Sequence, residues 1–379
     1  MKYELFGFQE DTLIAMREKV RIAREHASSQ NPQAISFSAP TGSGKTVMMA
    51  ALFEDIFFGA VGLPPQPDAA ILWVSDMPEL NEQTRRRLIK VSDRIGVHRL
   101  VTIDAGFDRE QLEPGSIHFI NVQKLGQDKR LTRQADGRSH AIWATFSNTA
   151  RAIPDRFYVV IDEAHRGMTG GKLAKEARTL IQRFLLGHAE TGLIRVPLVI
   201  GLSATPKRFT DLLEQAPHTL HKVPVPVADV RASGLLKDRI PIHSPKVAGD
   251  SEMSLLAEAA SVWVRMGQAW DAYCAVEQEQ RVWPILVVQV ENGTERQASR
   301  TDLGVALDVI EKAIGRSLLE GEAVHALHDC GDMDIGGRRV RRVDASRIDE
   351  DKGIGVVFFK TSLSTGWDCP RAEGMMSFR

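Results

Sequence analysis

The chain has 379 residues, and 48 Lys and Arg against 49 Asp and Glu give it a formal net charge of −1. This balance excludes a uniformly basic, histone-like nucleic-acid binder, but it is compatible with a basic groove in a neutral protein. Apolar residues at 43% and charged residues at 26% are typical of a soluble globular protein and exclude a disordered chain. At about 150 residues per domain, the length predicts two or three domains.

The three cysteines, Cys274, Cys330 and Cys369, lie far apart and form no Cys-x-x-Cys pair. They are too few for a disulfide framework or a thiolate zinc site, so we expect a protein of the reducing cytoplasm. The start of the chain lacks the layout of a signal peptide, and no segment approaches the ~20 apolar residues of a membrane span. We therefore expect no membrane partner.

Short apolar runs alternate with helical stretches along residues 1–225, which predicts parallel strands joined by crossover helices. We read this part as one doubly wound α/β lobe. Two prolines within 223–227 predict a linker without regular structure at its end. The expected strands are 34–37, 71–74, 117–121, 157–161 and 198–202, and the expected helices include 9–27, 45–57 and 78–95.

A second α/β series follows in residues 226–379. The pattern predicts a long helix over 252–278 and strands at 285–290, 324–327 and 354–359. A complete domain of this kind usually has more strands and helices. We therefore expect a second lobe that is C-terminally truncated.

The strongest motif follows the first expected strand and opens a helix, as a phosphate-binding loop requires: Ala39-Pro40-Thr41-Gly42-Ser43-Gly44-Lys45-Thr46. Gly42 and Gly44 allow backbone N–H groups to surround phosphate oxygens, and the helix N-terminus favours the anion. Lys45 is expected to reach the β- and γ-phosphates of ATP, and the Thr46 hydroxyl to ligate Mg²⁺. The alternative is a glycine-rich turn before a helix.

A second motif delivers two adjacent carboxylates at the end of an apolar strand: Tyr158-Val159-Val160-Ile161-Asp162-Glu163-Ala164-His165. Ligands bind at this end of the strands in doubly wound sheets. We expect Asp162 to hold Mg²⁺ and Glu163 to polarise the water that attacks the γ-phosphate. Taken alone, an Asp-Glu pair after a strand is more often a helix N-cap.

A third motif, Ser203-Ala204-Thr205, also stands at a strand end, and alone it would be read as a Ser/Thr turn closed by Pro206. Together and in this order, the phosphate loop, Asp162-Glu163-Ala164-His165 and Ser203-Ala204-Thr205 resemble a superfamily-two helicase of the DEAD/DEAH-box kind. The resemblance implies two RecA-like lobes with ATP between them and nucleic acid across both.

Weaker segments fit the same resemblance. Phe8-Gln9 resembles the segment that reads adenine, and 74–76 with 80–84 resembles the first nucleic-acid-contact motif. Asn121–Leu125 resembles the next contact motif, and Lys360–Asp368 the motif that links ATP and nucleic acid in the second lobe. The resemblance implies that Gln9, the residues Thr41, Gly42, Ser43, Gly44, Lys45 and Thr46, and Asp368 bind the nucleotide, and that His165, Ser203, Thr205, Thr365 and Gly366 couple the ATP state to the nucleic-acid grip.

Two details resemble the helicase (Res) subunit of type III restriction enzymes. These are Val230–Lys237, similar to the segment that joins the lobes, and the form Gly366-Trp367-Asp368 of the late motif. This resemblance implies an ATP-dependent translocase or helicase that acts on nucleic acid, with DNA favoured over RNA. It also implies a possible methyltransferase, specificity or nuclease partner.

Three basic clusters are candidates for contacts with nucleic-acid phosphates, although each alone is more often a solvated charged face. They are Arg85, Arg86, Arg87, Lys90, Arg94 and Arg99; Lys124, Lys129, Arg130, Arg133 and Arg138; and Arg338, Arg339, Arg341, Arg342 and Arg347.

The family's later arginine motif, which stabilises charge on the transferring phosphate, has no counterpart after Asp368, where Arg371 and Arg379 lack its context. Since such an arginine can be worth ~10³-fold in rate, we expect this chain to bind Mg·ATP but to hydrolyse it weakly by itself. A non-motor ATP-binding switch that assembles a complex is the alternative from another class. A metabolic P-loop kinase is disfavoured by the second and third motifs, and no nuclease signature is visible.

Overall fold

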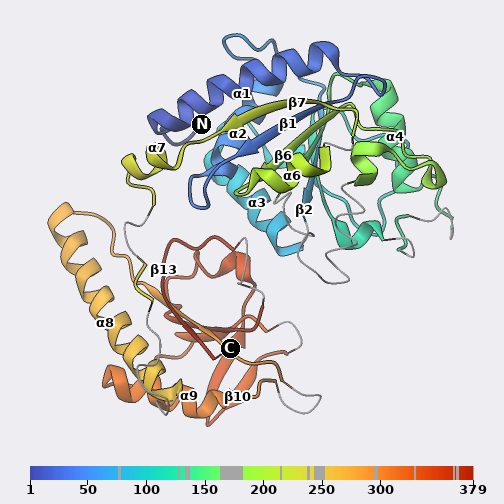
Figure 1. Ribbon diagram of the computed structural model, residues 1–379. Coiled ribbons are helices and arrows are strands. Elements are labelled where there is room, and N and C mark those ends of the chain that lie inside the picture. Colours follow the sequence, from blue (N-terminus) through green and yellow to red (C-terminus); the bar gives the residue numbers. More distant parts are fainter. Residues whose placement is uncertain are drawn as a thin grey trace. The chain divides into compact units, whose positions relative to one another are not determined.

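The computed structural model describes the chain except residues 76–77, 127–128, 133–136, 163–181, 214–215, 237–239, 243–251, 294–297, 328–329, 362, 364–366 and 379. The chain divides into two compact units, Met1–Ile240 and Pro241–Arg379 (Figure 1). The lobes expected from the sequence, 1–225 and 226–379, differ from these units in giving residues 226–240 to the second lobe.

A seven-stranded sheet with the order β3-β4-β2-β5-β6-β1-β7 forms the centre of the first unit. All of its pairings are parallel, which confirms the predicted doubly wound architecture. Strands β2, β4, β5 and β6 are buried at every residue, as parallel strands covered on both faces require. The strands are β1 (Gln33–Ser38), β2 (Ala70–Ser75), β3 (Leu100–Thr102), β4 (Ser116–Asn121), β5 (Phe157–Ile161), β6 (Leu198–Ser203) and β7 (Thr219–Pro224).

Helices cover both faces of this sheet, and alternate side chains of each strand face the two layers. In β2, Ile71 and Trp73 pack into the cluster that contains α1, α2 and α3, whereas Leu72 and Val74 pack into the cluster that contains α4 and α6. The helices of the first unit are α1 (Gly7–His26), α2 (Lys45–Phe58), α3 (Pro78–Val91), α4 (Ile142–Ala152), α6 (Pro206–Leu213) and α7 (Val227–Ala232), with 3₁₀ turns η1 (Val97–Arg99), η2 (Val122–Leu125) and η3 (Ala189–Thr191).

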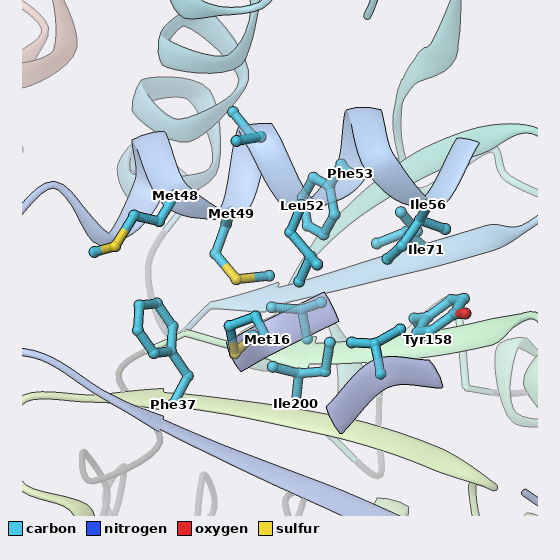
Figure 2. Close-up of a cluster of buried hydrophobic side chains, with 14 of the residues drawn as sticks. Met16, Phe37, Met48, Met49, Leu52, Phe53, Ile56, Ile71, Tyr158 and Ile200 are labelled. Atoms are coloured by element: carbon cyan, nitrogen blue, oxygen red, sulfur yellow. The ribbon is translucent and has the colours of Figure 1, made fainter. Parts of the chain in front are cut away.

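Helix α2 is anchored to the sheet by an apolar face that points at the strands (Figure 2). Met49, Leu52 and Phe53 are at most 1% exposed and lie against side chains such as Phe37 and Ile200. Since fully burying one such side chain stabilises the fold by about 1.5–3 kcal/mol, this contact holds the helix firmly against the sheet. The loop between β1 and α2 therefore starts and ends on rigid elements.

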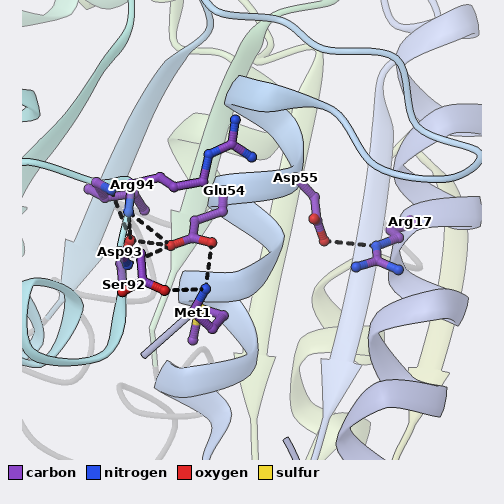
Figure 3. A network of polar contacts seen from close by, with 8 residues as sticks. Met1, Arg17, Glu54, Asp55, Ser92, Asp93 and Arg94 are labelled. Carbon is purple, nitrogen blue, oxygen red and sulfur yellow. Dashed lines mark hydrogen bonds and ion pairs between the residues drawn. The ribbon is translucent and has the colours of Figure 1, made fainter. Parts of the chain in front are cut away.

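Two polar contacts, one buried at Glu54 and one half-buried at Asp55, also fix α2 to its neighbours (Figure 3). Glu54 accepts hydrogen bonds from the Ser92 hydroxyl at 2.5 Å and the Asp93 N–H at 3.0 Å, just after α3. Burial alone would raise the pKa of Glu54, but these hydrogen bonds and the amino group of Met1 lower it below its ordinary value. Asp55 on the same helix pairs with Arg17 of α1 at 2.8 Å.

The prediction of an irregular linker at 223–227 is wrong. Strand β7 pairs with β1 at the edge of the sheet as far as Pro224, opposite Ser38, and the Val225 N–H donates to the Ser38 carbonyl at 2.8 Å. Pro226 then forms the N-cap of α7. An edge strand and the start of a helix both tolerate proline, because neither position needs the missing N–H.

The second unit contains a six-stranded sheet with the order β10-β11-β9-β12-β8-β13. β10 and β11 form an antiparallel hairpin, and the other strands pair in parallel. α8 and α9 cover one face, and a smaller apolar cluster around Val324, Val357 and Phe359 covers the other. The elements are α8 (Glu252–Glu277), β8 (Ile285–Gln289), α9 (Leu303–Ile314), β9 (Ala323–His325), β10 (Met333–Ile335), β11 (Arg338–Arg342), the 3₁₀ turn η4 (Ala345–Arg347), β12 (Val356–Phe359) and β13 (Ala372–Ser377).

In the described part of the chain, no helix combines the length and the apolar character that a membrane crossing needs.

Candidate nucleotide site

The register of the first sheet brings the ends of three strands to one edge. Ser38 of β1 lies opposite Ser203 of β6, and Ile161 of β5 lies opposite Gly201 of β6. The phosphate loop begins after Ser38, and Asp162 follows Ile161 directly. Segments that are far apart in the sequence therefore reach the same carboxyl edge, where open α/β sheets bind their ligands.

The phosphate loop turns sharply at its two glycines. Gly42 has φ +85° and Gly44 has φ +82°, a left-handed conformation that side-chain-bearing residues rarely adopt. A Cβ at Gly44 would also lie 2.6 Å from the Gln9 amide nitrogen. Both glycines are thus required by the backbone conformation, which suits a phosphate-binding loop and equally the glycine-rich turn of the alternative interpretation.

Gln9 ties the loop to the start of the first helix. Its side chain is 4% exposed, and its Nε2 donates to the Ser43 carbonyl at 3.0 Å. Its Oε1 accepts from the Phe6 N–H at 3.1 Å. The residue expected to read adenine therefore contacts the phosphate loop directly.

Lys45 stands at the first position of α2, where a helix offers N–H groups to an anion. Its Nζ donates to the carbonyls of Ala39 at 3.1 Å and Pro40 at 3.3 Å, so the ammonium group folds over the loop. A phosphate bound in the loop would be within the same reach of the lysine, and its negative charge would compete with these carbonyls for the ammonium group.

Asp162 and Thr46 are both half-buried, and they supply oxygen atoms of the kind that Mg²⁺ prefers. The Asp162 N–H donates to the Val74 carbonyl at 2.9 Å, which fixes the backbone beside β2. Among the described residues, no three His, Cys, Asp or Glu side chains gather as a metal cage. A donor set of one carboxylate and one hydroxyl fits Mg²⁺, which usually keeps several waters and binds substrate phosphates.

Ser203 forms the predicted Ser/Thr turn and also holds the phosphate loop. It is 1% exposed, and its Oγ accepts from the Thr205 N–H at 2.9 Å. Its carbonyl accepts from the Ala39 N–H at 3.1 Å, at the start of the loop. A Ser/Thr turn and a coupling role for this motif are therefore compatible. A movement of the turn would reach the phosphate loop through the hydrogen bond between Ser203 and Ala39.

Some predicted site residues lie outside the described residues, namely Glu163, His165, Thr365 and Gly366. In the second unit, Asp368 is exposed, whereas its neighbour Trp367 is half-buried and donates from Nε1 to the Ala345 carbonyl at 2.8 Å. Burial raises the pKa of the Cys369 thiol to about 12, so this cysteine stays protonated at neutral pH.

Arg371 is 3% exposed and serves the architecture of the second unit. Its guanidinium donates to the carbonyls of Asp351 at 3.1 Å and Ile354 at 3.0 Å. A guanidinium held in this way is not available to a transferring phosphate, in agreement with its lack of motif context.

The basic clusters are largely engaged within the protein. Arg85 and Arg86 both pair with Glu82, and Arg338 pairs with Asp308 and Glu311. Other members donate to backbone carbonyls, such as Lys124 and Arg138, or pair with aspartates, such as Arg339 and Arg341. The exposed members without an ion pair to a described residue are Lys90, Arg94, Lys129, Arg130, Arg342 and Arg347, of which Arg94 lies over the Phe58 ring.

One contact to the phosphate loop was not predicted. A Cβ at Gly42 would lie 3.3 Å from Cδ2 of Leu236, from the segment after α7. The two residues are far apart in the sequence, and no local pattern announces such a contact.

A parallel RecA-like sheet with these motifs in this order defines a superfamily-two helicase of the DEAD/DEAH type. A family model described as "Type III restriction enzyme, res subunit" matches residues 2–208, more than half of the chain. The chain belongs to this family. No curated protein matches the sequence significantly.

Among solved structures, one helicase shares the fold at low sequence identity, and two other helicases align less well. The DUF1998 helicase MrfA bound to DNA aligns with a TM-score of 0.54 and 16% identity over 96% of this chain, which spans 43% of the MrfA chain. S. cerevisiae Dbp5 bound to Gle1 and IP6 aligns with a TM-score of 0.45 and 12% identity, over 97% of this chain and 76% of Dbp5. The helicase domain of Pyrococcus furiosus Hef aligns with a TM-score of 0.35 and 14% identity, over 79% of this chain and 54% of Hef.

Proposed function

We propose that this chain is the motor part of an ATP-dependent translocase or helicase of restriction-enzyme type that moves on DNA. The observation that carries the proposal is the shared carboxyl edge of the first sheet, where the phosphate loop, Asp162 and Ser203 are joined by register and by backbone hydrogen bonds. The family supports the same conclusion.

In this proposal the residues of the edge divide the work of ATP hydrolysis. Lys45 and the first turn of α2 hold the β- and γ-phosphates, and Thr46 and Asp162 bind Mg²⁺, which offsets negative charge on those phosphates. Glu163 positions the attacking water. Gln9, Thr41, Gly42, Ser43 and Gly44 shape the nucleotide pocket.

The coupling of ATP to movement is assigned to His165, Ser203, Thr205, Thr365 and Gly366, with Asp368 on the nucleotide side of the second lobe. The hydrogen bond between the Ser203 carbonyl and the Ala39 N–H supports this assignment for Ser203, because it lies between a strand end and the phosphate loop.

DNA is the proposed track because the solved relative with the same fold is bound to DNA. Lys129 and Arg130 of the first unit and Arg342 and Arg347 of the second are exposed cations suited to backbone phosphates. We assign methylation, sequence recognition or cleavage to a partner or to a further domain, since no motif for them is visible in this chain.

Hydrolysis by this chain alone is proposed to be weak. The absence of the family's arginine motif from the sequence supports this, and the burial of Arg371 against backbone carbonyls removes a substitute.

The test is ATP binding and turnover by the 379-residue chain with duplex DNA, single-stranded DNA and RNA. We expect Mg²⁺-dependent nucleotide binding and slow turnover that DNA stimulates more than RNA. Lys45→Ala is the control and should abolish both. Nucleotide binding without any stimulation of turnover by nucleic acid would favour the ATP-binding switch. Activity retained by Lys45→Ala would contradict the phosphate-loop assignment.

A further inference from the structure

Leu236 reaches the phosphate loop from the segment through which the chain leaves the first unit. After α7, Gly234 adopts φ +79° and its N–H donates to the Arg231 carbonyl at 3.0 Å, which turns the chain. The next residue, Leu235, is 37% exposed, whereas Leu236 is half-buried against the apolar cluster under α2. Cδ2 of Leu236 then lies 3.3 Å from the Cβ position at Gly42.

Helix α7 is packed against the first unit, and this packing determines where Leu236 lies. Val230 in α7 is 0% exposed within the same apolar cluster. The Ser233 hydroxyl donates to the Val230 carbonyl at 2.7 Å and closes the turn. Leu236 is therefore delivered to the loop by an element with its own anchor.

The phosphate loop is held at two neighbouring residues by two elements outside the motif. The Gln9 side chain donates to the carbonyl of Ser43, and Leu236 packs against the preceding residue, Gly42. Thr41 and Gly42 are the exposed part of the loop, and a glycine has no side chain with which to limit its own backbone. A leucine methyl group against Gly42 restricts the motion that the glycine permits, and a pre-organised loop binds phosphate at a lower entropic cost.

We propose that Leu236 is a positioning residue of the nucleotide site, which holds the phosphate loop at Gly42 in its phosphate-binding conformation. The inference rests on the proposed ATP site. It makes the segment from α7 to Leu236 part of the nucleotide site, so that a displacement of this segment changes the affinity for phosphate.

The test compares Leu236→Ala with Leu235→Ala in the full 379-residue chain. The two variants remove the same atoms from adjacent leucines, of which Leu236 alone is placed against Gly42. The dissociation constants of Mg·ADP and of Mg·tripolyphosphate, which has phosphates but no base, are measured well below the melting temperature. We expect Leu236→Ala to weaken both ligands by about tenfold, Leu235→Ala to change neither, and Leu236→Met to restore most of the affinity.

The outcomes separate this inference from the proposed function. If the unaltered chain binds neither ligand, the ATP site itself is wrong. If it binds both and Leu236→Ala binds them as tightly or more tightly, Leu236 does not position the loop. Weakening of Mg·ADP alone would make Leu236 a wall of the base pocket, and equal weakening by Leu235→Ala would mean general destabilisation; either result overturns the proposal.

Discussion

The carboxyl edges of the two sheets use their polar side chains differently. At the edge of the first sheet, Lys45 and Asp162 stand on rigid backbone and carry groups that suit phosphate and Mg²⁺. At the corresponding edge of the second sheet, the described part of the late motif serves packing, because Trp367 donates from Nε1 to the Ala345 carbonyl. Arg371, at the opposite edge of that sheet where β13 begins, likewise serves packing and donates to the carbonyls of the 351–354 turn. A motif position thus identifies a place in the fold, and the contacts of the side chain there indicate whether it serves packing or suits a ligand.

The largest expected effect is at Asp162, to which the comparison of the two sheets gives a role in binding Mg²⁺. Asp162→Asn keeps the shape and the backbone bond to Val74 but removes the negative charge that favours Mg²⁺. We expect the rate of ATP hydrolysis to fall about a hundredfold or more, with little change in melting temperature. Single-turnover phosphate release with excess protein and DNA measures this. Unchanged hydrolysis by the variant would mean that Asp162 is a structural cap after β5.

The next largest effect is at Arg371, whose contacts give it a role in stabilising the fold of the second unit. Arg371→Ala leaves buried carbonyls without their donors, and we expect the free energy of unfolding of the second unit to fall by on the order of 3 kcal/mol. Hydrogen exchange of the amides of β12 and β13 measures this loss, and the amides of β1 in the first unit should not change.

Arg347→Ala, at an exposed position of the same unit, is the matched control and should leave exchange unaltered. If Arg371→Ala instead reduced ATP turnover without loosening the second unit, Arg371 would belong to the catalytic machinery, and the architectural role assigned to it would be wrong.

Much of the first sheet was predictable from the sequence, because parallel strands buried on both faces appear as continuous apolar runs. Strands such as β2 and β5 were predicted to within a residue or two on that basis. The hairpin of β10 and β11 was missed, since Arg-Arg-Val-Arg-Arg has the composition of a solvated loop. It is stabilised as a strand by ion pairs such as Arg338 with Glu311 and by a turn at Gly336 and Gly337, both with positive φ.

The candidate site shows the same division between local and distant information. The phosphate loop was predictable because its glycines and lysine must follow one another in the sequence. The hydrogen bonds from Gln9 to Ser43 and from Ala39 to Ser203 close over long separations, and Leu236 reaches Gly42 from the far end of the unit. Such contacts depend on the path of the whole chain, which no local pattern contains.

Acid should weaken the first unit through two histidines, His118, which is buried, and His218, which is half-buried. Burial lowers the pKa of His118 and of His218 to about 4 each. Because the folded state then binds fewer protons than the unfolded state, the stabilisation is fully present above pH ~6.5 and is lost as the pH falls toward ~4. We expect a loss on the order of 2 kcal/mol per histidine across this window.

His118→Gln isolates one of these contributions. Its nitrogen accepts from the Glu113 N–H at 3.3 Å, and a glutamine oxygen can accept in its place. The variant's free energy of unfolding, from urea denaturation at pH 7.5 and 5.0, should depend less steeply on pH than that of the unaltered chain. Identical pH dependence would mean that His118 is charged or solvated in the folded protein.

The smallest expected effect concerns the arginines of the second unit, and it tests whether an exposed cation of the basic cluster differs from an exposed cation elsewhere in the unit. Arg342 and Arg347 are exposed without an ion pair to any described residue, whereas Arg339 and Arg341 are paired with aspartates. If Arg342 contacts a DNA phosphate, Arg342→Ala should reduce the slope of log K against log salt concentration by about 1. Arg265→Ala on α8 makes the same change in net charge at an exposed site outside the clusters and should leave the slope unchanged. Equal slopes for both variants would show that the basic cluster acts only through its summed positive charge. The hairpin of β10 and β11 would then have a structural role and no direct contact with DNA.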